Sequence, residues 1–280
     1  MKKRLICAIL AIMMILFVGC GEKKKQVADS TDMAEPVDVI DEAMTPVYGD
    51  SLRDGVYDIA VDSSSTMFKI AACELTVSGG EMTAKLTMNS KSYLYLFMGT
   101  GEEAVKADEG AYISYVDDGE GSSFTVPVSA LDAGIDCAAF SKNKEMWYDR
   151  TLVFRADSLP LDAFNDGVIV TAASLGLADG DYTVDVTLTG GSGKASVQSP
   201  ADFTVTGGEA TVNIVWSSSN YDYMKVDGVR YDPVSVEEHS VFEIPLTAFD
   251  RQVTVIADTT AMSEPHEIEY TLYFDSTSVK

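Results

Sequence analysis

Leu52–Val61 reads LRDGVYDIAV and Leu177–Val186 reads LADGDYTVDV, so one pattern of residue types occurs twice. The stretch CELTVSGGEMTAKL at Cys73–Leu86 likewise returns as ADFTVTGGEATVNI at Ala201–Ile214. Two shorter pairs keep the order: FTVPVSALD at 124–132 with FEIPLTAFD at 242–250, and RTLVF at 150–154 with YTLYF at 270–274. Units this long can bury a core of their own, unlike the units of a solenoid. The sequence therefore predicts two copies of one domain.

Each copy has the pattern of short β-strands. Apolar residues alternate in Glu74–Val77 and Met82–Met88, on either side of a Ser-Gly-Gly-Glu turn, which is typical of a β-hairpin. No stretch has the period of a long amphipathic helix. We expect all-β antiparallel domains, sandwiches or barrels, at 52–159 and 177–280, joined by a linker at 160–176.

The N-terminus has the organisation of an export signal. Basic residues at positions 2–4 precede the apolar run Leu5–Val18, and Phe17-Val18-Gly19-Cys20 resembles the lipobox of bacterial lipoproteins. The alternatives are an ordinary signal peptide and a transmembrane anchor, for which the apolar run is short. We expect a lipoprotein signal peptide at 1–19 and lipidation of Cys20. The protein would then be anchored at the extracytoplasmic face of the bacterial cell membrane.

Composition limits what the rest of the chain can do. The stretch 20–51 is polar and acidic without an apolar period, which predicts a flexible tether. A net charge of −24 leaves no electrostatic route to nucleic acid. The only histidines, His239 and His266, both lie in the second copy, and no P-loop, GxSxG or GxGxxG motif is present. We therefore expect no enzyme.

Two cysteines lie in the repeated region, Cys73 and Cys137. Their counterparts in the second copy are Ala201 and Val255, so these positions accept apolar residues and the cysteines can simply be buried. A disulfide between them is allowed outside the cytoplasm, and the sequence leaves both states open.

Each copy also resembles the NEAT (near-iron transporter) domain, an immunoglobulin-like sandwich that binds haem on Gram-positive cell surfaces. The shared features are an opening DG-x-Y (Asp54-Gly55 and Tyr57; Asp179-Gly180 and Tyr182), a Ser-rich stretch, the Gly-Gly hairpin and a closing strand with aromatic residues. The resemblance implies two tandem immunoglobulin-like β-sandwiches with haem as cofactor. It also implies haem donor proteins and an ABC-type uptake system as partners.

The resemblance implies candidate haem contacts in the second copy. The family carries Y-x-x-x-Y near its end, where the first Tyr ligates iron, and His266 and Tyr270 occupy these two places. The alternative is a structural histidine. Ser192 would contact a propionate. Tyr221 and Tyr223, two residues apart and so expected on one strand face, would line the pocket or fill the core.

The first copy matches the ligand motif in two registers. Met146 aligns with His266 and Arg150 with Tyr270, whereas a shift by two residues places Tyr148 at the ligand position. A shift of two keeps the strand face, so Met146 and Tyr148 are both candidate iron ligands. The alternative is a packed edge strand. Ser64, the counterpart of Ser192, would contact a propionate.

Two other functions stay open, because a fold does not determine a function. The domains can form a surface module that binds a glycan or a host protein, or a structural spacer of the cell envelope. Neither of these functions requires haem.

Overall fold

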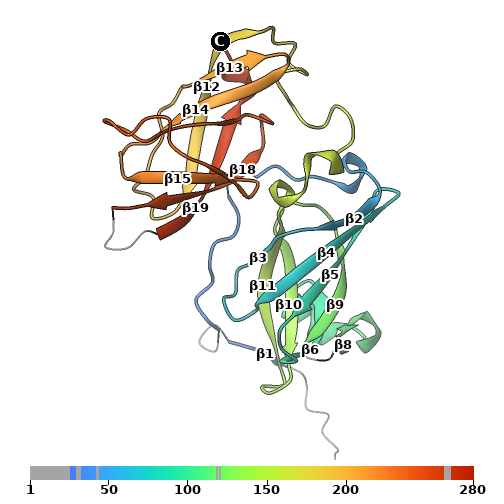
Figure 1. Ribbon diagram of the computed structural model, residues 1–280. Coiled ribbons are helices and arrows are strands. Elements are labelled where there is room, and N and C mark those ends of the chain that lie inside the picture. The colour runs from blue at the N-terminus through green and yellow to red at the C-terminus, as the bar shows by residue number, and fades with distance from the viewer. Residues whose placement is uncertain (1–25, 30–32, 42–43, 118, 120, 262–265) are drawn as a thin grey trace, which may run out of the picture.

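The computed structural model describes residues 26–29, 33–41, 44–117, 119, 121–261 and 266–280 (Figure 1). The expected signal peptide at 1–19 and Cys20 lie outside these residues. The described chain is nearly all β, with one α-helix, as the sequence predicts. Within it, no helix has the length and apolar character needed to cross a membrane.

The N-terminal part forms two facing sheets, called here the first sandwich (Figure 1). One sheet has the order β2-β4-β5-β9-β8, and the other has the order β1-β11-β10-β6-β7 with β3 added on β11. Residues that alternate along the strands, such as Leu75, Leu86 and Phe124, fill the space between the sheets. The strands are β1 (Gln26–Val27), β2 (Gly55–Asp58), β3 (Val61–Ser63), β4 (Ile70–Ser78), β5 (Glu81–Met88), β6 (Tyr93–Met98), β7 (Ile113–Ser114), β8 (Val116–Asp117), β9 (Ser122–Val128), β10 (Ile135–Ser141) and β11 (Met146–Phe154).

The C-terminal part, the second sandwich, repeats this strand order around a separate core. Its strands run β16-β15-β18-β19-β12-β13-β14-β17 in one continuous path, because β12 pairs with β13 through its first half and with β19 through its second. In the first sandwich the equivalent of β12 is broken into β2 and β3. The strands are β12 (Gly180–Gly190), β13 (Ala201–Thr206), β14 (Glu209–Val215), β15 (Tyr221–Val226), β16 (Val229–Tyr231), β17 (Val241–Pro245), β18 (Gln252–Thr259) and β19 (His266–Asp275).

A β-bulge occurs at the same place in both sandwiches. In the first, Phe140 and Ser141 of β10 pair with Tyr95 and Tyr93 of β6, which leaves Leu94 as an extra residue. In the second, the pairs Tyr223–Asp258 and Tyr221–Thr259 leave Asp222 extra in the same way. A bulge reverses the alternation of side chains, so the two tyrosines of each pair face opposite sides of their sheet. The expectation that Tyr221 and Tyr223 share one face is therefore wrong.

The two cysteines of the first sandwich are buried and free. Burial raises the pKa of both thiols to about 12, which keeps them in the neutral form at physiological pH. They act as small apolar side chains of the core, like their counterparts Ala201 and Val255.

The outer face of the β6–β10–β11 sheet carries a second apolar cluster. Phe140, Trp147 and Tyr112 are in ring contact there, beneath the only described α-helix, α1 (Gly101–Lys106). Thr100 and Glu103 form a capping box that fixes the start of this helix. Trp147 is fully buried as a result.

The described parts of the N-terminal segment, 26–29, 33–41 and 44–51, called here the arm, pack on the first sandwich, so these parts of the expected tether at 20–51 are not free of the fold. Strand β1 pairs in parallel with the start of β11, and Ala28 is buried. Val37 N–H donates to Ser64 O at 2.8 Å, and Val47 bridges to Leu131. The few apolar residues of the arm and the open edge of β11 together overcome its polar composition, because an unpaired strand edge offers hydrogen bonds to an added strand.

The expected linker at 160–176 is also packed against both sandwiches. Leu161–Ala163 forms a 3₁₀ turn, and Phe164 belongs to the first core and bridges to Leu52. Ala172 belongs to the second core, and Val170 bridges to Phe249. The connection between the sandwiches therefore contributes buried surface to each of them.

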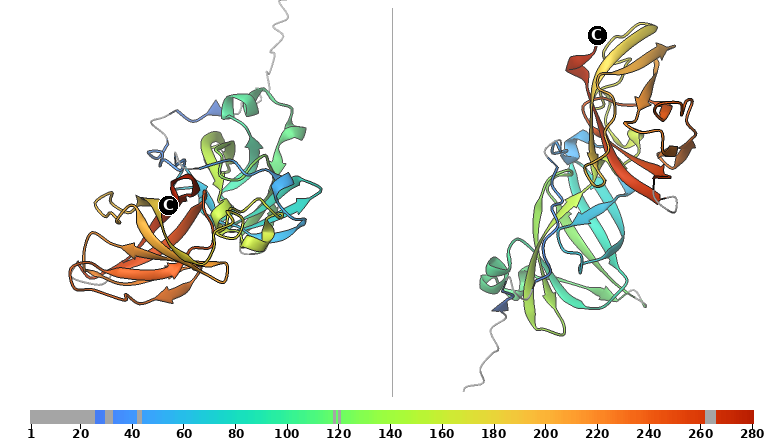
Figure 2. Two further views of the ribbon diagram at one scale, coloured as in Figure 1. Left: turned by 90° about the horizontal axis from the view of Figure 1, so that it is seen from above. Right: turned by 90° about the vertical axis from the view of Figure 1, so that its left-hand side faces the viewer.

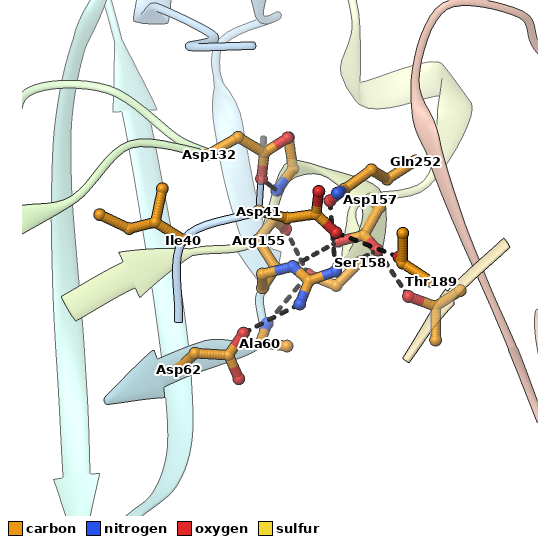
Figure 3. Close-up of polar contacts among 12 residues, drawn as sticks. Ile40, Asp41, Ala60, Asp62, Asp132, Arg155, Asp157, Ser158, Thr189 and Gln252 are labelled. Atoms are coloured by element: carbon orange, nitrogen blue, oxygen red, sulfur yellow. Dashed lines mark hydrogen bonds and ion pairs between the residues drawn. The ribbon is translucent and has the colours of Figure 1, made fainter. Parts of the chain in front are cut away.

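A polar network holds the two sandwiches end to end (Figures 2 and 3). Arg155 donates two hydrogen bonds to Asp157 (3.1 and 2.9 Å), one to Asp62 (2.9 Å) and one to Gln252 of the second sandwich (3.4 Å). Thr254 of the second sandwich donates to Asp157 at 2.5 Å. Burial lowers the pKa of Arg155, but the carboxylates of Asp157 and Asp62 together outweigh it and raise the pKa, so the guanidinium stays charged. We call this network the junction.

Candidate functional site

A cavity of about 250 Å³ opens at the end of the first sandwich that lies away from the junction. The start of β6, the β10–β11 hairpin and the loop after β3 surround it, all near β1 in Figure 1. Its wall combines apolar groups with hydroxyls, two cations and the carboxylate Asp149. The lining residues used below are Ser64, Ser92, Tyr93, Ser141, Lys144, Tyr148 and Arg150.

The structure brings together two of the predicted first-copy residues, Tyr148 and Ser64. Ser64 lies in the loop after β3 and is fixed against β11, because its N–H donates to Thr151 O and its Oγ accepts the Thr151 N–H, both at 2.9 Å. Tyr148 lies on β11 itself, three residues before Thr151, and is half-buried in the cavity wall. Met146 does not line this cavity and instead pairs with Gln26 of the arm.

Arg150 forms the inner wall of the cavity and is only 5% exposed. Its guanidinium stacks on Phe68 and Tyr93, with distances of 4.2 and 5.2 Å from Cζ to the ring centroids. Nη2 donates to Tyr148 O at 2.8 Å, whereas Nε and Nη1 have no hydrogen-bond partner. Within the described chain, no ion pair joins Arg150 to an acidic side chain.

The arm supplies another wall of the cavity. Met33, Ala34 and Pro36 line it, next to the hydrogen bond from Val37 N–H to Ser64 O. Binding cavities for drug-sized molecules measure roughly 300–1,000 Å³. A ligand of that size fits only when this part of the arm shifts outward.

In the second sandwich, aromatic side chains fill the equivalent space. Tyr270 is 3% exposed, and its hydroxyl lies 3.3 Å from that of Tyr221. Trp216 is fully buried, stacks on Tyr221 with a centroid distance of 4.1 Å and meets the Tyr270 ring at 5.1 Å. Burial and the Tyr270 hydroxyl raise the pKa of Tyr221, which disfavours the phenolate form that binds iron.

Gly191 closes this side of the second sandwich. Its φ is +57°, and a Cβ added there would lie 2.6 Å from the Tyr270 ring, so only glycine lets the loop approach so closely. A ligand can reach Tyr270 only by displacing this loop or the neighbouring aromatic rings.

The other predicted second-copy residues do not gather around Tyr270. His266 is exposed at the first position of β19, opposite Thr259, and Ser192 is exposed in the turn after β12. Four residues separate His266 from Tyr270, which along one strand is about 13 Å. Both lie on the same face of β19, as alternation predicts.

Tyr223 lies on the outer face of the second sandwich, because of the bulge at Asp222. Its hydroxyl donates to Glu267 Oε1 at 2.5 Å, and Arg230 covers its ring at 4.0 Å. The bond to Glu267 raises the pKa of Tyr223 to about 12. Tyr223 is therefore not part of a pocket shared with Tyr221.

The residues of the first cavity fit haem better than those of the second sandwich do. Tyr148 offers a phenol as axial ligand, and Lys144 and Arg150 offer charge for propionates. Among the residues that the structure describes, no three His, Cys, Asp or Glu side chains gather as ligands for a metal ion.

The repeat aligns Arg150 with Tyr270, but it does not predict that Arg150 lines a cavity. The available signal was a charge at a position where alternation with Leu152 and Phe154 predicts an inward side chain. Phe68, which holds the guanidinium, has no counterpart among the repeat motifs and could not be found from them.

No protein-family model matches the chain, and no curated protein matches it. Among solved structures, part of the chain is similar to the NEAT5 domain of IsdX2, a Bacillus anthracis hemophore in complex with heme. The two are 19% identical in sequence, and the match covers 36% of this chain and 98% of that domain with a TM-score of 0.30.

Proposed function

We propose that this chain binds haem in the cavity of its first sandwich. The observation that supports the proposal is the cavity itself, which places the phenol of Tyr148 beside the cations Lys144 and Arg150 and the Ser64 loop. The second sandwich, whose equivalent space is filled by Trp216, serves as a rigid partner held by the junction.

Each group of the first cavity has a part in this proposal. Tyr148 would ligate the iron through its phenol oxygen. Tyr93 and Met67 would pack on the ring, while Lys144 would pair with a propionate. Bound in this way, haem is carried as cargo and supplies no chemistry to a reaction.

A pair of matched variants tests the site. Ser92 is an exposed residue on the cavity wall, and Asn220 is its counterpart in the second sandwich. We expect haemin to bind the processed full chain with one equivalent and a sharp Soret band. Ser92→Trp should abolish this band by obstructing the cavity, while Asn220→Trp should leave it unchanged.

The opposite pattern, or an equal loss in both variants, would rule out the first cavity as the site. Two equivalents in the wild type would show that the second sandwich also binds, and His266→Ala would then test its ligand. Absence of any haemin band, with retained binding to glycans or host proteins, would favour a surface binding module instead.

Anchoring and relay complete the proposal. Lipidation of Cys20 would hold the protein at the extracytoplasmic membrane face, where it would pass haem to an ABC-type uptake system. In membrane fractionation, Cys20→Ala should release the protein. A variant that stays in the membrane fraction with its signal removed would contradict the lipoprotein assignment.

A further inference from the structure

Arg150 is a buried positive charge that forms no ion pair within the described part of the chain. A guanidinium is always charged, and taking it out of water is costly unless its N–H groups and its charge are both satisfied. Here one hydrogen bond to Tyr148 O serves Nη2, while Nε and Nη1 are left without acceptors at 5% exposure. The fold therefore maintains an unsatisfied cation at the back of a cavity.

The surroundings hold this guanidinium in place without neutralising it. The rings of Phe68 and Tyr93 pack on it, which favours a cation but offers no acceptor to its N–H edge. The adjacent carboxylate, Asp149, is engaged elsewhere, since its Oδ1 accepts the Gly101 N–H at 2.5 Å at the start of α1.

A second cation, Lys144, also lines the cavity, together with Ser92 just before β6 and Ser141 at the end of β10. The one acidic residue of the lining, Asp149, accepts the Gly101 N–H. These two cations are gathered at one cavity in a chain whose net charge is −24. Two positive groups at one end of such an acidic molecule attract a negatively charged ligand locally.

We propose that Arg150 binds a carboxylate of the ligand inside the cavity, so that the site selects planar aromatic acids over their uncharged esters. The inference rests on the proposed haem binding and adds the group that the protein recognises. Nε and Nη of a guanidinium match the two oxygens of a carboxylate in a bidentate pair. Nε–H and Nη1–H have no acceptor and lie on different edges of the guanidinium, so either of them can pair with the second N–H of Nη2, whose first N–H serves Tyr148 O.

The proposal explains why the chain retains an unfavourable group. Replacing a buried charge that has no partner by an apolar side chain of similar length is often neutral or stabilising. Arg150→Met should therefore raise the melting temperature of the ligand-free protein while it weakens binding of the acid. A residue with a purely structural role would lower both.

The experiment compares haemin with haemin dimethyl ester, titrated into the processed full chain. We expect the wild type to bind the free acid at least about tenfold more tightly than the ester, the scale of a charged hydrogen bond. In Arg150→Met this preference should disappear. Lys85→Met, which removes an exposed cation from the opposite sheet, should keep it.

Each result has a distinct meaning. Equal affinities for acid and ester in the wild type would overturn the role of Arg150 while leaving haem binding intact. Failure of both ligands to bind would instead overturn the proposed function. If Arg150→Met does not fold, Arg150→Gln keeps a donor for Tyr148 O and tests the same loss of preference; a full acid preference in that variant would also overturn the inference.

Discussion

The two sandwiches share one backbone but differ at one end. Both have the same strand order and the same bulge between their paired tyrosines. At the cavity, however, Arg150 of the first sandwich stands where Tyr270 packs on Trp216 in the second. The comparison teaches that side chains, and not the strands that carry them, decide whether this end of the fold is open.

The largest expected effect comes from removing a ring from the aromatic cluster that fills the second sandwich. Tyr270→Ala removes a ring that packs on Trp216 and Tyr221, and truncation of a buried aromatic side chain costs about 3–5 kcal/mol. Trp147 and Trp216 are the only tryptophans, one in each sandwich, so fluorescence in a denaturant titration follows both. We expect early unfolding of the second sandwich.

The control for this variant is Tyr273→Ala, at a half-buried position on the other face of β19. It should cost clearly less than Tyr270→Ala. Equal losses for the two tyrosines would contradict the closed aromatic cluster.

A second prediction concerns the junction that joins the two halves. Arg155→Met leaves Asp157, whose side chain is 4% exposed, without its cation, and should lower the free energy of unfolding by about 2–3 kcal/mol. The two sandwiches should then melt in separate calorimetric steps. A single unchanged transition in the variant would mean that the packed linker alone couples them.

A third prediction compares how the stability of the two sandwiches depends on pH. Equivalent aspartates follow β9 and β17, Asp132 in the first sandwich and Asp250 in the second. Burial raises the pKa of Asp132 to about 6, although the Ala156 N–H that it accepts acts against this. The folded state therefore holds a proton that the unfolded state has lost. This contribution to stability is present below the unfolded pKa and is lost as the pH rises toward 6.

Asp132→Asn should remove this pH dependence, so its stability relative to wild type should rise by about 1–2 kcal/mol between pH 4 and pH 7. Denaturant titrations across that range measure it. The matched variant is Asp250→Asn, whose carboxylate accepts two hydrogen bonds from Ser276. A flat difference for Asp132→Asn would show that the carboxyl titrates normally.

The smallest expected effect tests the outer face. Tyr223→Phe removes an exposed hydrogen bond to Glu267 and should change the free energy of unfolding little, because solvent screens exposed polar pairs. Tyr221→Phe, which removes a buried hydroxyl contact with Tyr270, should cost more. The reverse order would contradict the bulge that places the two tyrosines on opposite faces.

The sequence predicts the all-β fold because alternation and the Gly-Gly turns are local features that both copies repeat. It does not predict that Tyr221 and Tyr223 lie on opposite faces of their sheet, since a one-residue bulge reverses the faces without leaving a pattern in the residue types. Composition also does not predict that the described parts of the arm pack on the first sandwich, because that packing depends on pairing with the edge of β11. The repeat led to Tyr148 and Ser64 in the first cavity, but the aromatic filling around Tyr270 depends on contacts between distant segments.

The arm has a further consequence for the height of the cavity above the membrane. Only five residues lie between Cys20 and Gln26, where the chain joins the first sandwich. At about 3.5 Å per residue, even a fully stretched chain would span roughly 20 Å. With Cys20 lipidated as proposed, the mouth of the cavity stays near the bilayer surface. Haem that partitions into the lipid surface would then meet the site at a high effective concentration, set by the length of this short segment.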